Sequence, residues 1–269
     1  MQIHPTAIID PGAKLGANVE VGPYAIIARD VAIGDATRIG PHAVIHPFTT
    51  IGKNCSIHTN AVIGDLPQDY AFKPEIRSFV KIGDGVMIRE NVTIHRGTKP
   101  DSTTEVGDEC FLMVGAHLAH NVKLGRRVLI VNNALLAGYV EVGDGAIISG
   151  GAVIHQFTRI GRLAMLSGLS GIGKDVPPFC VCAGVNLNTV AGLNVVGMRR
   201  AGLGPDDRKQ IKRAFDILYR RNLNFRAVPA AIRAEFPAGP ALEIADFVAA
   251  SKRGVCPYRG GSAAEDTAE

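Results

Sequence analysis

The sequence predicts a mainly β chain that winds as a parallel β-helix of hexapeptide repeats, followed by a small α-helical C-terminal domain. Every sixth residue is aliphatic from Ile3 to Ile63, and the same spacing returns from Ile82 to Ile172 with one exception at Pro100. A fixed internal period marks a solenoid, and a period of six fits neither the 3.6 of a helix nor the 2.0 of a strand. Short strands separated by turns satisfy it, because each strand can point one aliphatic side chain to a shared axis.

The first block of repeats covers residues 3–63, and the period is broken at about 64–81, which we interpret as a loop extruded from the solenoid wall. A second, shorter interruption surrounds Pro100. Loops that interrupt a rigid scaffold often carry function, and a tolerated insertion is the alternative. Three hexads per coil place every third hexad above the same point of the coil below. About 27 hexads then predict about nine coils, on the order of 43 Å tall at ~4.8 Å per coil.

We expect the β-helix to span residues 1–186 and the helical domain to span 187–260. The period ends near Ile172, and from Pro205 the apolar spacing becomes helical, with Ile211, Phe215 and Leu218 on one stripe. Pro at the start of a helix is favourable. Further helices are expected at about 227–235 and 241–252, and a disordered tail at 261–269.

The bulk composition excludes several classes of protein. A net charge of +4, with no basic stripe interleaved with aromatics, argues against a dedicated nucleic-acid binder. No apolar run approaches the roughly 18 residues needed to span a bilayer. Five cysteines without a Cys-x-x-Cys pair indicate reduced thiols in a cytoplasmic protein. The repeat begins at Ile3, so we expect no signal peptide.

One column of residues carries candidate chemistry. His120, Gly138 and Gln156 follow one another at intervals of three hexads, so an imidazole, a glycine and an amide are predicted to line one edge of the solenoid on successive coils. Histidine is a suitable general base near neutral pH. A glycine lets a substrate approach the backbone, whose N–H can support a developing oxyanion. The column therefore favours an acyl-transfer site.

Two further features have competing interpretations. His117-x-x-His120 could supply two ligands of a zinc site shared between subunits, as in some hexapeptide solenoids, although no histidine-rich cluster stands out. Residues 197–233 contain ten basic and three acidic residues. That segment is either a solvated helix surface or a docking surface for an acidic carrier protein or a phosphorylated substrate.

Several motifs together resemble one enzyme family. They are Ile94-His95-Arg96-Gly97, Ala116-His117-Leu118-Ala119-His120, Asn132-Asn133-Ala134, Leu136-Ala137-Gly138, Val153-Ile154-His155-Gln156-Phe157, Asp175-Val176-Pro177-Pro178 and Gly197-Met198-Arg199-Arg200. With them the chain resembles, over nearly its whole length, the UDP-N-acetylglucosamine O-acyltransferases of lipid A biosynthesis. The resemblance implies a left-handed β-helix that forms a homotrimer. It also implies transfer of an R-3-hydroxyacyl group from acyl carrier protein to the glucosamine 3-position of the UDP-sugar, with no cofactor beyond the carrier thioester.

The resemblance also implies roles for individual residues. His120 matches the general base and Gly138 the oxyanion donor. Positions that match substrate contacts are Asp69 and Gln68 for the sugar, His117, His155 and Gln156 along the cleft, Asn194 for the uridine, Arg200 with Arg199 for the nucleotide or its phosphates, and, more loosely, the loop lysine Lys73. Gly168 matches the position that limits acyl length, where glycine implies a longer chain, and Gly150 would extend the same groove.

Three positions depart from the family's pattern. Asn121 stands where the family often has an aspartate, and Tyr139 and Leu187 stand where it often has histidines. These departures leave the base in place and keep open the acyl length and the same reaction on a 3-amino UDP-sugar. A second alternative, which rests on the His117-x-x-His120 spacing, is a zinc-dependent enzyme of the γ-carbonic anhydrase type.

Overall fold

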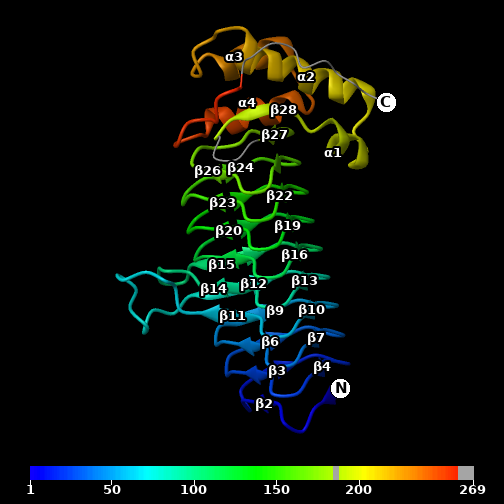
Figure 1. The fold of residues 1–269 in the computed structure, drawn as a ribbon, viewed down its shortest axis with the longest axis vertical. Helices are drawn as coiled ribbons and strands as arrows, with labels where there is room; N and C mark the ends of the chain where they lie inside the picture. Colours follow the sequence, from blue (N-terminus) through cyan, green and yellow to red (C-terminus); the bar gives the residue numbers. More distant parts are fainter. Residues whose placement is uncertain (184–187, 260–269) are drawn as a thin grey trace.

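In the computed structural model, which describes residues 1–183 and 188–259, the chain forms a left-handed parallel β-helix with a helical region at its C-terminal end (Figure 1). Very short strands follow one another around a triangular prism, so that each coil adds one strand to each of three sheets, here called A, B and C. The turns between strands define three corners, A–B, B–C and C–A. This arrangement follows from the period of six, since each hexad holds one strand and one turn.

In spatial order, sheet A contains β1 (Gln2–Ile3), β4 (Glu20–Val21), β7 (Arg38–Ile39), β10 (Ser56–Ile57), β13 (Met87–Ile88), β16 (Phe111–Leu112), β19 (Leu129–Ile130), β22 (Ile147–Ile148), β25 (Met165–Leu166), β27 (Cys180–Cys182) and β28 (Val190–Leu193). Sheet B contains β2 (Ile8–Ile9), β5 (Ile26–Ile27), β8 (Val44–Ile45), β11 (Val62–Asp65), β14 (Thr93–His95), β17 (His117–Leu118), β20 (Leu135–Leu136), β23 (Val153–Ile154) and β26 (Gly171–Ile172). Sheet C contains β3 (Lys14–Leu15), β6 (Ala32–Ile33), β9 (Thr49–Ile51), β12 (Phe79–Ile82), β15 (Thr103–Val106), β18 (Lys123–Leu124), β21 (Glu141–Val142) and β24 (Arg159–Ile160).

The pairing register explains why the period looks broken twice. In uninterrupted coils the partners are three hexads apart, as for Ile3 and Val21. Ile51 pairs with Ile82, 31 positions on, and Ile82 pairs with Val106, 24 positions on. The extra thirteen and six residues are therefore insertions at corners, and the coil resumes its register after each.

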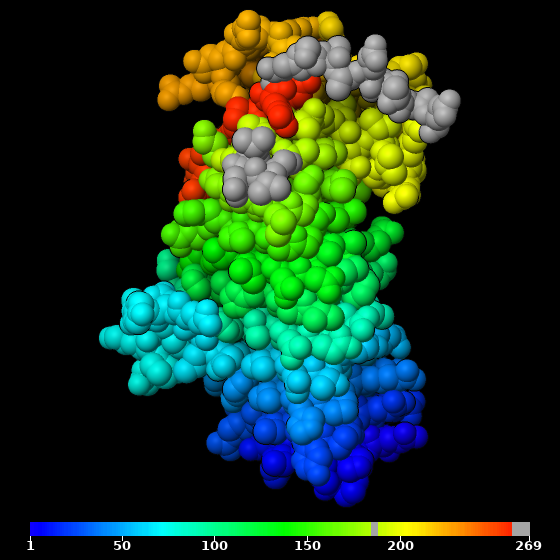
Figure 2. Space-filling view, in the orientation of Figure 1, coloured from blue at the N-terminus to red at the C-terminus, as the bar shows by residue number. Residues whose placement is uncertain are grey.

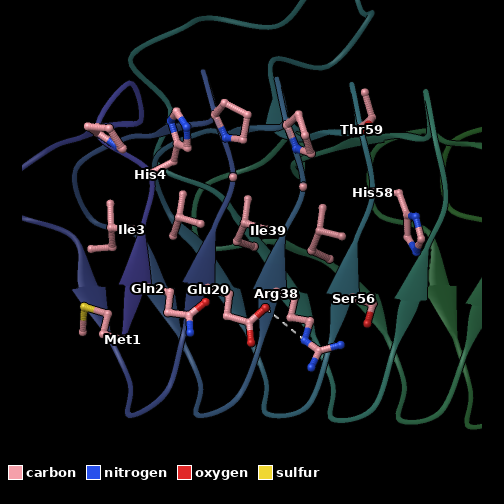
Figure 3. A pocket seen from close by; sticks show the side chains of 17 residues that line it. Met1, Gln2, Ile3, His4, Glu20, Arg38, Ile39, Ser56, His58 and Thr59 are labelled. Carbon is pink, nitrogen blue, oxygen red and sulfur yellow. Dashed lines mark ion pairs between the residues drawn. The ribbon is translucent and has the colours of Figure 1, made fainter.

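The repeating aliphatic residue of each hexad forms the core. These side chains stack along the axis and are almost fully buried, with Ile45, Ile63, Leu118 and Leu136 at 0% exposure. Figure 3 shows the same order near the N-terminus, where Gln2, Glu20, Arg38 and Ser56 form one row and a row containing Ile3 and Ile39 lies beside it. A narrow core of this shape has room for branched aliphatic side chains, which explains why aromatics are few.

The first insertion leaves the B–C corner as a loop between β11 and β12, shown in cyan at the side of the solenoid in Figure 2. It is shorter than the interval 64–81, because residues 64–65 and 79–81 belong to those strands. The guanidinium of Arg96 fastens it: Nη2 donates to the carbonyl of Pro74 at 3.1 Å, and its Cζ lies 5.3 Å from the Phe72 ring centroid. The loop base is thus held against the wall.

The C-terminal region differs from the expectation in three details. Within the expected range of the β-helix, β27 adds a parallel strand to β25, but β28, which pairs with β27 antiparallel, lies beyond the expected boundary at 186. The helices are α1 (Val195–Arg200), α2 (Pro205–Arg220), α3 (Val228–Glu235) and α4 (Ala241–Ala249). The short α1 was not predicted, and α4 ends before position 252. The stripe on α2 is buried as predicted. Leu187 and the tail 261–269 lie outside the described residues.

The helices pack onto the upper end of the solenoid (Figure 1). The buried side chains of Leu163 and Phe179 join those of the helices in one apolar cluster. Beside it, the guanidinium of Arg162 donates two hydrogen bonds to the carboxylate of Glu243 on α4, at 2.8 and 2.7 Å. In the part of the chain that the structure describes, no helix combines the length and the apolar character that crossing a membrane requires.

Candidate functional site

The predicted column lies at the B–C corner. His120, Gly138 and Gln156 occupy the same place in the turns that follow β17, β20 and β23, and these strands are hydrogen-bonded neighbours. Each turn continues with a residue in the left-handed conformation, at Asn121, Tyr139 and Phe157. The turn lifts the preceding side chain off the wall, so the functional groups of three coils face one groove.

The imidazole of His120 lies directly against the backbone of Gly138. A β-carbon placed on Gly138 would stand 2.6 Å from Nε2 and 2.9 Å from Nδ1 of that ring, which is closer than real side chains approach. Only glycine therefore leaves the ring in this position. Within residues 1–183 and 188–259 the Gly138 N–H has no hydrogen-bond partner, while its carbonyl accepts from the N–H of Phe157. An N–H without a partner can donate a hydrogen bond to an oxygen atom on which negative charge develops during a reaction.

On its other side, the His120 ring contacts a polar network. Nδ1 lies 3.1 Å from Oδ1 of Asn121, which is 6% exposed. The same oxygen accepts from both the backbone N–H and the hydroxyl of Thr98, each at 3.0 Å. The Thr98 hydroxyl is also 3.0 Å from the hydroxyl of Tyr139. Thr98 comes from the second insertion, so that short interruption reaches the candidate base.

Two further imidazoles lie close to the column, that of His117 on the same coil as His120 and that of His95 one coil below. Nδ1 of His117 is 2.7 Å from the hydroxyl of Thr93, and its ring meets that of His95 edge to face at 4.9 Å. Burial, followed by the neighbouring His117, lowers the pKa of His95 to about 4. Burial also lowers the pKa of His117. Both rings are therefore neutral near pH 7. His95 was not among the predicted site residues, although it belongs to one of the motifs on which the family resemblance rests.

A groove of about 320 Å³ runs along this corner. His117, His120, Gly138 and Gln156 line it. Beside them the outward side chains of Leu135 and Val153 are 42% and 50% exposed. The groove thus combines a titratable ring and a free N–H with an apolar wall, a surface that suits a substrate with one polar and one hydrocarbon part.

Of the three predicted contacts in the extruded loop, one lines the groove and two do not. Gln68 lines it. The carboxylate of Asp69 accepts from the N–H of Ala71 at 2.9 Å and so shapes the loop, and Lys73 is exposed to solvent. His155 does not line the groove. It is exposed, and its Nδ1 donates to the carbonyl of Gln156 at 3.0 Å.

Three predicted nucleotide contacts lie elsewhere, near the C–A corner. Asn194 caps α1, with Oδ1 accepting from the N–H of Gly197 at 2.9 Å and Nδ2 donating to the carbonyl of Leu163 in a C–A turn at 2.8 Å. Arg199 and Arg200, on the same helix, are exposed. None of the three lines the His120 groove. A single chain therefore does not bring the two groups together.

The predicted acyl-length position lies at the remaining corner, A–B. Gly168 follows β25, and Gly150 occupies the same turn position one coil below. A β-carbon on Gly168 would meet nothing nearer than the carbonyl oxygen of Gly150 at 3.3 Å. That contact is tight, but no other atom lies within 4 Å of the β-carbon position. Gly168 is separated from His120 by the outer face of sheet B.

Lys174 extends the B–C column by one coil, three hexads after Gln156. It is exposed and borders a second hollow, of about 680 Å³, whose lining also includes the basic side chains of Arg226 and Arg233 and the partly exposed ring of Phe225. Arg233 is paired with Asp246. In the described residues, Lys174 and Arg226 have no carboxylate within ion-pair distance, so their charges are available to an external anion.

The side chains around the column do not form a metal-binding donor set. Among the described residues, no three histidine, cysteine or acidic side chains converge at metal-binding distances. Instead His117 contacts Thr93, and Nδ1 of His120 contacts Asn121. All five cysteines are buried free thiols.

Comparison with known proteins follows the same division of the chain. A family model described as "Udp N-acetylglucosamine O-acyltransferase; Domain 2" matches residues 175–256, and one described as "Bacterial transferase hexapeptide (six repeats)" matches residues 30–65. A relative from Sulfurihydrogenibium sp. that is named acyl-[acyl-carrier-protein]–UDP-N-acetylglucosamine O-acyltransferase is 51% identical over 259 residues, 96% of this chain and 95% of its own. One of the same name from Thermodesulfovibrio yellowstonii is 43% identical over 257 residues, 95% and 99% of the two chains.

Solved structures agree with these relatives. The UDP-N-acetylglucosamine acyltransferase of Bacteroides fragilis superimposes with a TM-score of 0.89 at 40% identity, covering 94% of this chain and 98% of its own. That of Campylobacter jejuni gives a TM-score of 0.90 at 36% identity, covering 96% and 100%. The similarity thus includes both the solenoid and the helical region.

Proposed function

The chain belongs to the UDP-N-acetylglucosamine O-acyltransferase family, and we propose that it transfers an R-3-hydroxyacyl group from acyl carrier protein to the 3-hydroxyl of UDP-N-acetylglucosamine, the first step of lipid A biosynthesis. The observation that carries the proposal is the imidazole of His120 lying against Gly138, whose N–H has no partner among the described residues, in a half-apolar groove. A base and an oxyanion donor side by side are what acyl transfer to a hydroxyl requires.

In the proposed reaction His120 removes the proton from the sugar hydroxyl, whose oxygen attacks the thioester carbonyl. The resulting oxyanion accepts a hydrogen bond from the N–H of Gly138. Collapse of this intermediate breaks the carbon–sulfur bond, and the imidazolium of His120 returns the proton to the departing thiolate. The thioester of the carrier is the co-substrate, and the scheme needs no other cofactor.

The sugar is proposed to lie between the loop and the column, in contact with Gln68, Asp69, His117, His155 and Gln156, with Lys73 near the loop's outer edge. Gln68, His117 and Gln156 line the groove beside His120. Asp69 and Lys73 belong to the loop that Arg96 fastens at this corner. A loop anchored in this way can hold a polar ligand over the base without losing its own shape.

The nucleotide is proposed to contact Asn194, Arg199 and Arg200 of a neighbouring subunit. These residues lie near the C–A corner, whereas His120 lies at the B–C corner, so one chain cannot supply both groups to one ligand. A homotrimer, in which the C–A corner of each copy faces the B–C corner of the next, joins them. The exposed side chains of Leu135 and Val153 would then be covered by the neighbour.

The acyl chain is proposed to end beside Gly168, where the absence of a side chain leaves room, with Gly150 extending the groove. The carrier protein is proposed to dock at the hollow above the column, where Lys174 and Arg226 are available to its acidic surface. Reduced thiols and a carrier-linked substrate both suit the cytoplasm, which we propose as the site of the reaction.

The test is acyl transfer by the purified full chain from hydroxyacyl carrier protein to UDP-N-acetylglucosamine, with the 3-amino sugar as a second acceptor. His120→Ala is expected to lower kcat by about 10²-fold or more. His4→Ala, an exposed histidine near the N-terminus, is the matched control and should keep full activity. Full turnover by His120→Ala would overturn the role of the base. Preference for the 3-amino acceptor would revise the substrate.

A further inference from the structure

We propose that Thr98, Asn121 and Tyr139 form a positioning network that keeps the proton of neutral His120 on Nδ1, so that Nε2 is free to accept a proton without the help of a carboxylate. The inference rests on the function proposed above and deepens it. In the described residues no acidic side chain lies within ion-pair distance of the His120 ring, and the group beside Nδ1 is the uncharged amide of Asn121.

The orientation of the Asn121 amide is decided by its neighbour. Oδ1 lies 3.0 Å from the backbone N–H of Thr98, and a backbone N–H can only donate. Rotating the amide by half a turn would bring its NH₂ against that N–H, so that two partly buried donors would face each other without an acceptor. Such a clash costs about 1–3 kcal/mol. Oδ1 therefore faces Thr98, and the same oxygen lies 3.1 Å from Nδ1 of His120.

The tautomer of His120 follows from this orientation. Oδ1 of Asn121 is an acceptor only, so Nδ1 of His120 must carry hydrogen to bond with it. A neutral imidazole has one N–H, and Nε2 is then left with its lone pair. This is the form that a general base needs, and the amide selects it through geometry rather than charge.

Backbone contacts hold Asn121 in place. Its own N–H donates to the hydroxyl of Thr104 at 2.7 Å. Its φ of 60° is left-handed, a conformation that asparagine tolerates better than most residues. Thr98 reaches the amide because six extra residues enter the coil between β14 and β15. The second insertion thus supplies the donors that orient the Asn121 amide beside His120.

Tyr139 completes the chain of hydrogen bonds. Its hydroxyl lies 3.0 Å from that of Thr98. If Tyr139 donates this hydrogen bond, the Thr98 hydroxyl accepts it and can donate its own hydrogen to Oδ1 of Asn121. The Tyr139 ring stacks on Phe157 at 4.9 Å and meets His120 edge to face at 5.3 Å. It therefore also supports the imidazole from the next coil up.

The titratable groups around His120 come from three coils. Tyr139 lies on the coil above, His117 lies on β17 just before the turn that holds His120, and His95 lies on the coil below. Beyond His95 lie His46 and Asp65, which face each other at 3.8 Å. Asp65 is the nearest of these with a negative charge, and it is directed to His46 rather than to His120.

The first test replaces Asn121 by Asp, which keeps an acceptor for Thr98 and adds a charge. A carboxylate beside Nδ1 favours the imidazolium, so the acid limb of kcat/KM against pH is expected to move up by about one pH unit or more. Asn121→Leu removes the acceptor and is expected to lower kcat by about 10²-fold or more, with little change in KM for the UDP-sugar. If Asn121→Asp is active and Asn121→Leu is not, the acceptor beside Nδ1 is what matters. A role of residue 121 in packing alone would not distinguish the two variants in this way.

The second test reads the tautomer without activity. Nitrogen-15 NMR of the ring nitrogens, with the His120 signals assigned by their loss in His120→Gln, should show hydrogen on Nδ1 in the native chain and a shift toward Nε2 in Asn121→Leu. Hydrogen on Nε2 in the native protein, or an unmoved acid limb in Asn121→Asp, would overturn the network. A native protein with the expected tautomer and no acyl transfer would refute the proposed function instead.

Discussion

The imidazole of His120 rests on the backbone of Gly138, so close that a β-carbon at position 138 would stand 2.6 Å from Nε2. The two residues are three hexads apart in the chain and one coil apart in the solenoid. This contact brings the proposed base against a glycine whose N–H has no partner among the described residues. Glycine is needed here because a β-carbon would collide with the ring, not because the backbone is left-handed.

Gly138→Ala is expected to displace the imidazole and reduce kcat/KM by about 10²-fold or more, since small misplacements of a catalytic group are costly. The backbone at 138 is not left-handed, so the added methyl group should leave Tm nearly unchanged. Gly192→Ala is the matched control, because nothing lies within 4 Å of its β-carbon position. Equal activity of the two variants would contradict the contact.

Two inactive variants should restore each other if the site is shared between subunits. His120→Ala removes the base at one corner, and Arg200→Glu removes the proposed nucleotide contact near another. Mixed oligomers contain some clefts with both native groups, about a quarter of all clefts for equal random mixing in a trimer. We expect activity near that fraction after co-expression. If the mixed oligomers are no more active than the separate variants, then His120 and Arg200 do not meet in a cleft between two subunits.

Gly168→Met is expected to shorten the acyl chain that the enzyme accepts. Glycine leaves this position without a side chain, and a methionine there would occupy the proposed end of the acyl groove. Its β-carbon would meet only the carbonyl oxygen of Gly150, at 3.3 Å. Rates with long hydroxyacyl donors should fall about tenfold or more, as one or two lost methylene contacts already change selectivity by that amount. Rates with short donors should stay the same. A uniform loss at every chain length would point to misfolding, which circular dichroism would detect.

Lys174→Glu combined with Arg226→Glu is expected to raise KM for the carrier-linked donor, because both cations border the hollow above the column. The same variant should use a short pantetheine thioester as well as the native chain does. Lys53→Glu, which reverses a charge on the lower solenoid, is the control. Equal KM values for the carrier in both variants would remove the hollow from the docking surface.

Acid should destabilise the protein through His95. Its folded-state pKa of about 4 lies below the ordinary 6.5, so between these values the unfolded chain binds a proton that the folded chain does not. Stability therefore falls as pH falls from 6.5 to 4, by about 3 kcal/mol at the lower end. His95→Phe, which keeps an aromatic ring beside His117, should show a smaller loss in urea unfolding at fixed protein concentration. His117, whose pKa is also lowered, accounts for part of what remains.

Much of the site was predictable because a solenoid converts spacing directly into position. The interval of three hexads is enough to place His120, Gly138 and Gln156 on successive coils. The two insertions were visible as broken periods. Their extents were not, since a strand can continue into an interruption without a change of pattern, as Gly64 and Asp65 do in β11.

The network around the base was not predictable in the same way. Thr98 lies before Asn121 by an interval that is not a multiple of the hexad, and only the paired coils bring its N–H to that amide. The burial of His95 was equally hidden, because its hexad slot is exposed at His4 and His155.

From the amino-acid sequence alone come the solenoid, its register and the column of candidate groups, because each depends on a local repeat that every coil obeys. The tertiary structure alone decided that Nδ1 of His120 faces the amide of Asn121, and that Asn194, Arg199 and Arg200 lie near another corner than the column. Those outcomes depend on contacts between segments whose separation follows no period, and only the packed coils specify them.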